Sequence, residues 1–162
     1  MLSRFAGNRP LDSLGITGAF TGMSSWADYP RLEGVRVLVV EAVPIVRDLV
    51  TDALEQFGAE VIAVDSASAA LGLVKRERPD VIVSSLRMPE KNGYWLIRRL
   101  RSMSADHGGR TPAIAFTGCT TKEDRLNALR AGFQSHVPKP VDLRELARVV
   151  ALWSLRREAV LA

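Results

Sequence analysis

The stretch VIVSSLRMPEKNG, residues 81–93, decides the fold. It begins with an unbroken apolar run, which is typical of a strand buried on both faces of a parallel sheet. Asn92 and Gly93 then turn the chain into a helix with apolar positions that include Leu96 and Leu100. Ser85 ends the strand, where sheets of this class hold their functional side chains. The function has to account for a neutral hydroxyl at this position.

The same alternation of strand and helix continues on both sides of this stretch. Apolar runs predict strands at residues 35–40, 60–64, 80–85, 112–117 and 133–137. Each is followed by a segment with apolar positions at helical spacing. Every crossover is long enough for a right-handed βαβ unit, so the sheet should be parallel. The expected fold class is therefore α/β, a three-layer doubly wound sheet of five strands.

Local signals mark the predicted ends of the helices. Pro44 can open the first helix and Gly58 can end it. Ser66 can cap the second. A helix over about 121–131 follows the fourth strand, and Asp142 with Glu145 three residues later forms a capping box for the last helix.

The chain divides into an N-terminal arm, residues 1–33, and one domain, residues 34–162. The arm is rich in Gly, Ser and Pro and shows no sustained period. It nevertheless carries four aromatic residues, Phe5, Phe20, Trp26 and Tyr29. Two interpretations remain open: a solvated tail, or an arm that docks on its own domain or on a partner.

Composition places the chain among soluble globular proteins, with 47% hydrophobic and 25% charged residues. We expect a cytoplasmic protein, because no apolar run is long enough to span a membrane and Cys119 is the only cysteine. The net charge of +4 is mildly basic. Its densest cluster, Arg98, Arg99 and Arg101 with Arg110 nearby, is expected to be a solvated face.

In a parallel sheet the carboxyl ends of the strands meet at one edge. The residues to examine there are Glu41, Ala42, Ser85, Thr117 and Lys139. No metal-ligand cluster is visible elsewhere, since His107 and His136 lack cysteine or acidic partners at ligand spacing.

Four motifs occur in order: VLVVEAVP (37–44), SSLRMPEKNG (84–93), AFTG (115–118) and VPKP (137–140). Together they resemble the receiver domains of response regulators in two-component signalling, typified by the chemotaxis receiver. The resemblance covers about residues 35–160. It implies the strand order 2-1-3-4-5, phosphoryl transfer to an aspartate, a bound Mg²⁺ and a cis bond before Pro140.

Transferred to this sequence, the family's phosphoacceptor position is Ser85. The two metal-binding acids correspond to Glu41 and Ala42. The other matching positions are the strand-four hydroxyl Thr117, the strand-five lysine Lys139 and the switch position His136.

The resemblance thus points to a receiver whose pocket is partly dismantled. A serine hydroxyl is neutral at pH 7 and needs a base before it can attack a phosphoryl group. Magnesium prefers anionic oxygens, so Glu41 facing Lys139 would be a poor site. We therefore expect an ion pair between these two residues, weak or absent Mg²⁺ binding, and no enzymatic activity.

The expected function is a stand-alone pseudo-receiver that acts by protein–protein contact. Its partner would be a histidine kinase, another regulator or a second copy, met through the surface of the last two helices and the fifth strand. That surface contains Lys122, Arg125, Gln134, His136, Arg144 and Arg148. Two alternatives stay open: a phosphorelay receiver using Ser84, Ser85 or Glu90, and a nucleic-acid-binding regulator using arginines of the third and fifth helices.

Overall fold

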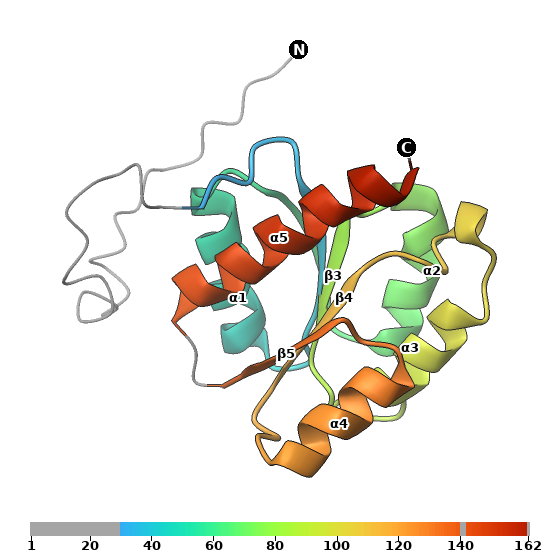
Figure 1. Ribbon diagram of the computed structural model, residues 1–162. Coiled ribbons are helices and arrows are strands. Elements are labelled where there is room, and N and C mark those ends of the chain that lie inside the picture. Colours follow the sequence, from blue (N-terminus) through green and yellow to red (C-terminus); the bar gives the residue numbers. More distant parts are fainter. Residues whose placement is uncertain (1–29, 140–141, 162) are drawn as a thin grey trace.

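The computed structural model describes residues 30–139 and 142–161, with side chains as far as residue 156 (Figure 1). The aromatic residues of the predicted arm and the bond between Lys139 and Pro140 lie outside these residues. The predictions made for them stay untested.

Five parallel strands form one sheet in the order β2-β1-β3-β4-β5, as predicted. The strands are β1 (Arg36–Val40), β2 (Glu60–Val64), β3 (Val81–Ser84), β4 (Ala113–Thr117) and β5 (Ser135–Pro138). They alternate with α1 (Pro44–Gln56), α2 (Ala67–Glu77), α3 (Gly93–Arg101), α4 (Lys122–Ala131) and α5 (Leu143–Leu161). A short 3₁₀ turn, η4 (Ala105–His107), precedes β4 and was not expected from the sequence.

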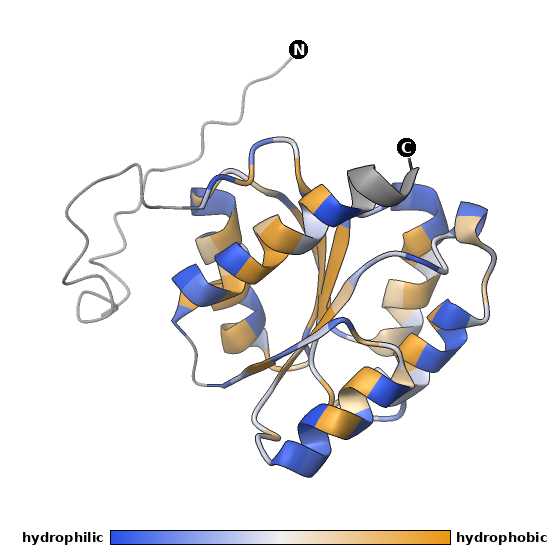
Figure 2. Cartoon of the chain, viewed as in Figure 1, coloured by the Kyte–Doolittle hydropathy of each residue, from blue (hydrophilic) through white to orange (hydrophobic). Residues whose placement is uncertain are grey.

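The helices cover both faces of the sheet. α1 and α5 lie on one face, and α2, α3 and α4 lie on the other (Figure 1). Each side has its own apolar core, and hydrophobic residues colour the strands and the inward sides of the helices (Figure 2). Because every central strand is buried on both faces, β3 and β4 have no polar alternation.

Helix ends follow the predicted signals in most places. Pro44 starts α1 and Gly58, at φ +100°, follows its end. Ser66 accepts a hydrogen bond from the amide of Ala69, and Asn92 accepts one from the amide of Trp95. Side-chain oxygens thus satisfy amides that the first turn of each helix leaves unpaired.

The fifth strand begins two residues later than predicted. Phe133 donates its backbone N–H to Ala128 of α4, so its amide still belongs to the end of that helix. Regular pairing with β4 starts at Ser135. The capping box that the structure shows is at α4, where Thr121 and Asp124 exchange hydrogen bonds. At the start of α5, Asp142 accepts from the amide of Arg144.

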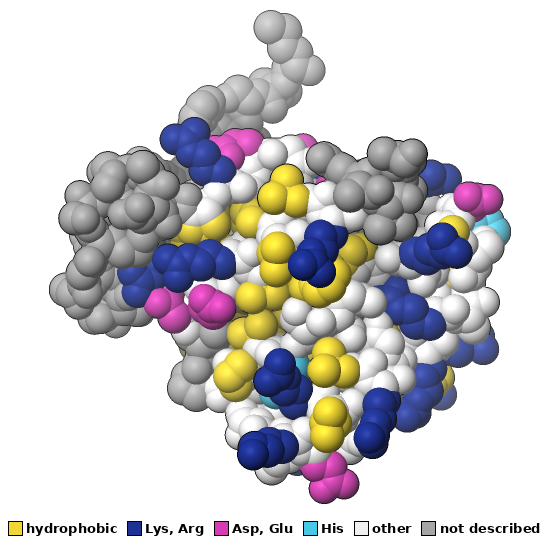
Figure 3. Space-filling view, in the orientation of Figure 1, with side chains coloured by type: hydrophobic (Ala, Val, Ile, Leu, Met, Phe, Trp, Pro, Cys, Tyr) yellow, Lys and Arg dark blue, Asp and Glu magenta, His cyan; other side chains and the backbone are white. Residues whose placement is uncertain are grey.

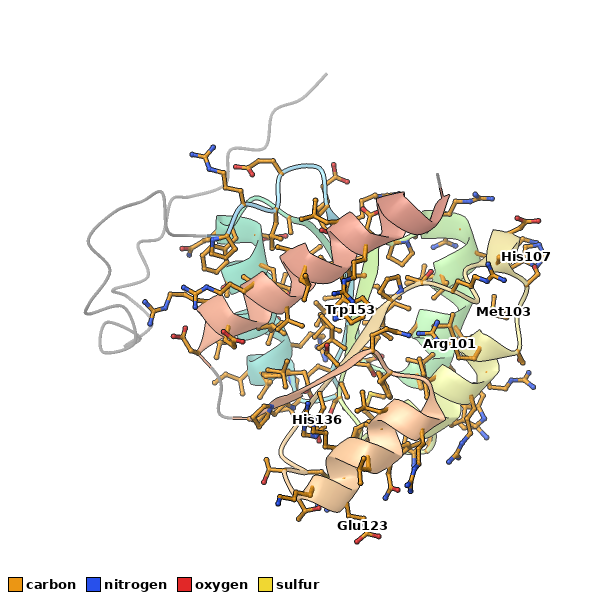
Figure 4. All side chains as sticks on the ribbon, viewed as in Figure 1. Arg101, Met103, His107, Glu123, His136 and Trp153 are labelled. Carbon is orange, nitrogen blue, oxygen red and sulfur yellow. The ribbon has the colours of Figure 1, made fainter. Side chains whose placement is uncertain are left out.

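The expectation of a solvated arginine face is wrong for Arg101, which turns inward from α3 toward β5 (Figure 4). Its guanidinium donates to the carbonyls of Gly109, Thr111 and Gly132 at 2.8–3.0 Å and to the Gln134 side chain at 2.8 Å. Burial lowers the pKa of Arg101 to about 10, so the group stays charged at neutral pH. Arg98 and Arg99 remain exposed, as predicted.

No helix in the described part of the chain combines the length and apolar character needed to cross a lipid bilayer.

Candidate functional site at the carboxyl ends of the strands

The four strand ends chosen from the sequence meet at one edge of the sheet. Glu41 follows β1, Ser85 follows β3, Thr117 ends β4 and Lys139 follows β5. Backbone hydrogen bonds continue the ladder past the strands, from Ser85 N–H to the Val40 carbonyl and from Lys139 N–H to the Thr117 carbonyl. The backbone therefore fixes the relative positions of these residues.

Glu41 and Lys139 form the predicted ion pair. The Lys139 ammonium donates to Glu41 Oε2 at 2.5 Å, and the Glu41 side chain is only 4% exposed. The other carboxylate oxygen accepts the backbone N–H of Val43 at 3.1 Å. The ammonium also lies 5.0 Å from the centre of the Phe116 ring. Both oxygens of the buried carboxylate thus have protein partners.

Ser85 is 5% exposed and lies in a tight turn. Its hydroxyl donates to the Arg87 carbonyl at 3.3 Å, a long distance for an O–H donor, while Ser84 donates to the Ser85 carbonyl at 2.9 Å. The start of α3 presses on this turn, because a Cβ at Gly93 would lie 2.4 Å from the Ser85 carbonyl oxygen. Only glycine fits there without moving the strand end.

Thr117 and Ala42 complete the group. Thr117 is 2% exposed, and its hydroxyl oxygen accepts the backbone N–H of Cys119 at 3.1 Å. That contact holds the turn after β4. Ala42 lies between Glu41 and Val43 with no side chain able to bind a cation. The site therefore contains one carboxylate, one ammonium and two hydroxyl groups.

The residues present do not fit the magnesium site that the fold family implies. Mg²⁺ prefers several anionic or neutral oxygens in an octahedron. Here Glu41 is already bonded to Lys139 and to Val43 N–H. Over the described ranges, no group of three or more His, Cys, Asp or Glu side chains could hold a metal ion.

Sequence reasoning missed one side chain that supports the site. Arg47, on α1, donates to the carbonyl of Glu41 at 2.9 Å and to that of Ala42 at 3.4 Å. It fastens the loop after β1 to the helix that follows. The pattern gave no signal for it, because an arginine in the second turn of a helix is usually a solvated residue.

His136 is partly exposed in the wall of a surface groove, but it makes a contact that the sequence did not predict. The residue is half-buried on β5, and its Nε2 lies 2.7 Å from the carbonyl oxygen of Cys119 (Figure 4). A carbonyl only accepts, so Nε2 carries the proton in this contact. The imidazole thereby links β5 to the loop that leaves Thr117.

The predicted partner surface divides into two kinds of residue. Lys122, Arg125 and Arg148 are exposed. Gln134, in contrast, accepts hydrogen bonds from Arg101 and from the backbone N–H of Ala113, so its amide is an internal brace. The guanidinium of Arg144 pairs with Asp142 and is mostly covered, and the same contact lowers the pKa of Asp142.

A groove of about 420 Å³ runs along this surface between α4, β5 and α5. Its walls include Arg125, Leu129, His136, Pro138 and Val149. Lys and Arg side chains are spread over the α3 and α4 side of the molecule in Figure 3, with few acidic residues among them. The groove combines apolar walls with charges of both signs, because Asp142 and Glu145 line it as well as Arg125.

Comparisons with known proteins agree with this geometry. The family description "Response regulator receiver domain" matches residues 37–151. An uncharacterised 14.6 kDa protein of Leptolyngbya boryana is 44% identical over 119 residues, which cover 74% of this chain and 89% of that protein. Sensor histidine kinase GacS of Pseudomonas protegens is 32% identical over 74% of this chain, but the match spans only 13% of that kinase.

Solved structures give the same result. The receiver domain of sensor histidine kinase PA1611 from Pseudomonas aeruginosa, solved with a magnesium ion in its active site cleft, superposes with a TM-score of 0.68. It is 31% identical, and the superposition covers 75% of this chain and 98% of that domain. A Francisella receiver domain superposes with a TM-score of 0.71 at 24% identity, over 76% of this chain and 99% of that one. By sequence and by fold, this chain belongs to the response regulator receiver domain family.

Proposed function

We propose that this chain is a receiver of two-component signalling that works in the cytoplasm by binding another protein, without aspartyl phosphorylation and without enzymatic activity. Family membership supplies the signalling context. The loss of phosphorylation is inferred from the strand ends. The observation that carries the proposal is the ion pair between Glu41 and Lys139 beside a serine at position 85.

Phosphoryl transfer needs a nucleophile and neutralisation of the charge on the transferring oxygens. Ser85 lacks a base, because the one nearby carboxylate, Glu41, already accepts from an ammonium and a backbone amide. The same two contacts occupy the oxygens that a metal would need. Both requirements of the family reaction are therefore poorly met.

The groove between α4, β5 and α5 is the surface that we propose for the partner. Leu126 and Leu129 are large apolar side chains on α4 that remain 49% and 37% exposed. Arg125 lines the groove together with Asp142 and Glu145, and the neighbouring Arg148 pairs with Glu145 at 3.7 Å, so charges of both signs border it. An apolar strip bordered by charges of both signs suits a helix or loop of a signalling protein whose edge carries complementary charges.

The direct test is labelling of the wild-type protein by a small acyl phosphate donor with Mg²⁺, followed by intact mass measurement. We expect no added phosphoryl group. Reversible labelling at Ser84, Ser85 or Glu90 would overturn the proposal and would favour a phosphorelay receiver with an unusual acceptor. The Ser85→Asp, Ala42→Asp variant described below is the positive control for the donor.

The partner surface has its own test. Charge reversal at Arg125 should abolish capture of a partner kinase or regulator from the native cytoplasm. Arg99→Glu, an equal charge change on an exposed site of α3, is the matched control and should leave capture intact. Equal loss in both variants would show that net charge matters and that the groove does not.

A further inference from the structure

A second cavity lies at the opposite edge of the sheet, where the strands begin. It has a volume of about 270 Å³ and is bounded by the end of α2, the η4 turn, the start of β4 and the far part of α5. Its lining includes Val74, Pro112 and Trp153, with the polar side chains of Arg78, Asp106, Arg110 and Arg156. Ligand pockets usually have volumes of about 300 Å³ or more, so a cavity of about 270 Å³ has room for a small molecule at most.

The aromatic wall of the cavity is held in place. The indole N–H of Trp153 donates to the hydroxyl oxygen of Ser135 at 2.7 Å, and the ring is half-buried (Figure 4). The guanidinium of Arg156 lies 4.9 Å from the centre of the same ring. A fixed ring and a cation over it form a preorganised contact, which reduces the entropy lost on binding.

The turn that forms the opposite wall is also fixed. Gly108 has φ +97°, and a Cβ there would lie 2.4 Å from the Val74 side chain, so η4 packs directly on α2. Arg78 ends α2 in the left-handed conformation at φ 47°. That backbone conformation is uncommon for a residue other than glycine, and here it turns the chain at the mouth of the cavity.

The charge around the cavity is strongly one-sided. The lining contains three guanidinium groups and one carboxylate. The guanidinium groups belong to Arg78, Arg110 and Arg156, and the carboxylate belongs to Asp106. Among the residues whose side chains the structure describes, no carboxylate lies at ion-pair distance from Arg78 or from Arg110, although several other arginines have such a partner. Guanidinium groups bind carboxylates and phosphates through two parallel hydrogen bonds.

We propose that this cavity binds a small anion that carries a flat ring: the ring packs against Trp153 and the carboxylate or phosphate meets the arginines. Two sources offer this chemistry, an aromatic acid and a nucleoside monophosphate. The site is separate from the strand ends that carry the proposed function, so it stands or falls independently. It would make the domain responsive to a metabolite.

The test measures binding of four probes to the full chain by titration calorimetry. The probes are AMP and benzoate, which carry both a ring and an anion, adenosine, which lacks the anion, and inorganic phosphate, which lacks the ring. We expect saturable binding of AMP or benzoate, and the better of the two identifies the source. Adenosine and phosphate should each bind at least about tenfold more weakly, because each lacks one of the two contacts.

Variants locate the site. Arg110→Ala and Arg156→Ala should each weaken binding by about tenfold, the expected effect of one lost charge-assisted contact. Arg98→Ala, an exposed arginine beside Tyr94 on α3, is the control and should bind like the wild type. Melting curves check that all three variants are folded.

Three results would overturn the proposal. One is no saturable binding of any probe at about 1 mM, where even weak specific sites begin to fill. Another is phosphate binding as tightly as AMP and benzoate, which would mean that the ring contributes nothing. The last is an equal loss in Arg98→Ala, which would show attraction to net charge without a site.

Discussion

Lys139 and Glu41, 98 positions apart in the sequence, join the ends of strands β5 and β1 across the edge of the sheet through a contact of 2.5 Å. Between these strands lie β3 and β4, which end at Ser84 and Thr117. The ion pair therefore links the strands that flank β3 and β4 at this edge.

The first prediction concerns this bond. Lys139→Met leaves a carboxylate that is 4% exposed without its cation, and it should lower the free energy of unfolding by about 3 kcal/mol. The double variant Glu41→Gln, Lys139→Met removes both charges and should recover much of the loss. Urea unfolding of the single and double variants measures both effects. A single variant as stable as the wild type would show that solvent already screens the pair.

The second prediction concerns restoration of chemistry. Ser85→Asp supplies the nucleophile, but its carboxylate would pair with Lys139, and Glu41 would remain the one acid from β1. We expect no labelling by an acyl phosphate donor. Adding Ala42→Asp supplies further oxygens for Mg²⁺ and should permit Mg²⁺-dependent labelling, which intact mass would detect. Equal labelling of both variants would mean that the metal site had not been the obstacle.

The third prediction concerns Arg101. Arg101→Met should lower the free energy of unfolding by about 3 kcal/mol, because it leaves the carbonyls of Gly109, Thr111 and Gly132 and the Gln134 side chain without a donor. Arg98→Met, on the exposed face, should change stability by at most about 0.5 kcal/mol. Thermal and chemical unfolding both report the difference. Similar losses in the two variants would assign the effect to helix propensity.

The fourth prediction concerns pH. The hydrogen bond from the Thr121 hydroxyl lowers the pKa of Asp124, so the capping box stabilises α4 above the unfolded pKa of about 4. That stabilisation is lost as the pH falls through the lowered pKa of the folded protein. Asp124→Asn should therefore reduce the melting temperature at pH 7, and the difference from the wild type should shrink toward pH 2. A difference that is constant with pH would exclude the carboxylate as its source.

The periodic features of the chain could be predicted from its sequence, whereas most side-chain contacts between distant residues could not. Apolar runs and helix caps were enough for five strands, five helices and their order, because each signal is local or follows from the family motifs. The Glu41–Lys139 pair was predictable, since strand ends of a parallel sheet converge. The inward turn of Arg101 was not, because its four acceptors come from loops 8 to 33 residues away.

The hydrogen bond of His136 was missed for a similar reason. Its ring bonds to the carbonyl of Cys119, 17 residues away, and nothing in the sequence around it announces that contact. The 3₁₀ turn at Ala105–His107 likewise depends on packing against α2, which the glycine pair Gly108–Gly109 does not by itself predict. Contacts that hold loops in place cannot be predicted from sequence periodicity, because the sequence separation between the two partners follows no regular spacing.

Strand β5 is only four residues long, which corresponds to about 13 Å. At its beginning Ser135 holds the indole of Trp153, and just past its end Lys139 holds the carboxylate of Glu41. If the strand shifted along its axis as a rigid unit, both the Trp153–Ser135 hydrogen bond and the Lys139–Glu41 ion pair would be stretched. β5 thus connects the cavity at the start of the strands to the site at their carboxyl ends. A displacement of the strand at one end would therefore disturb the contact at the other end.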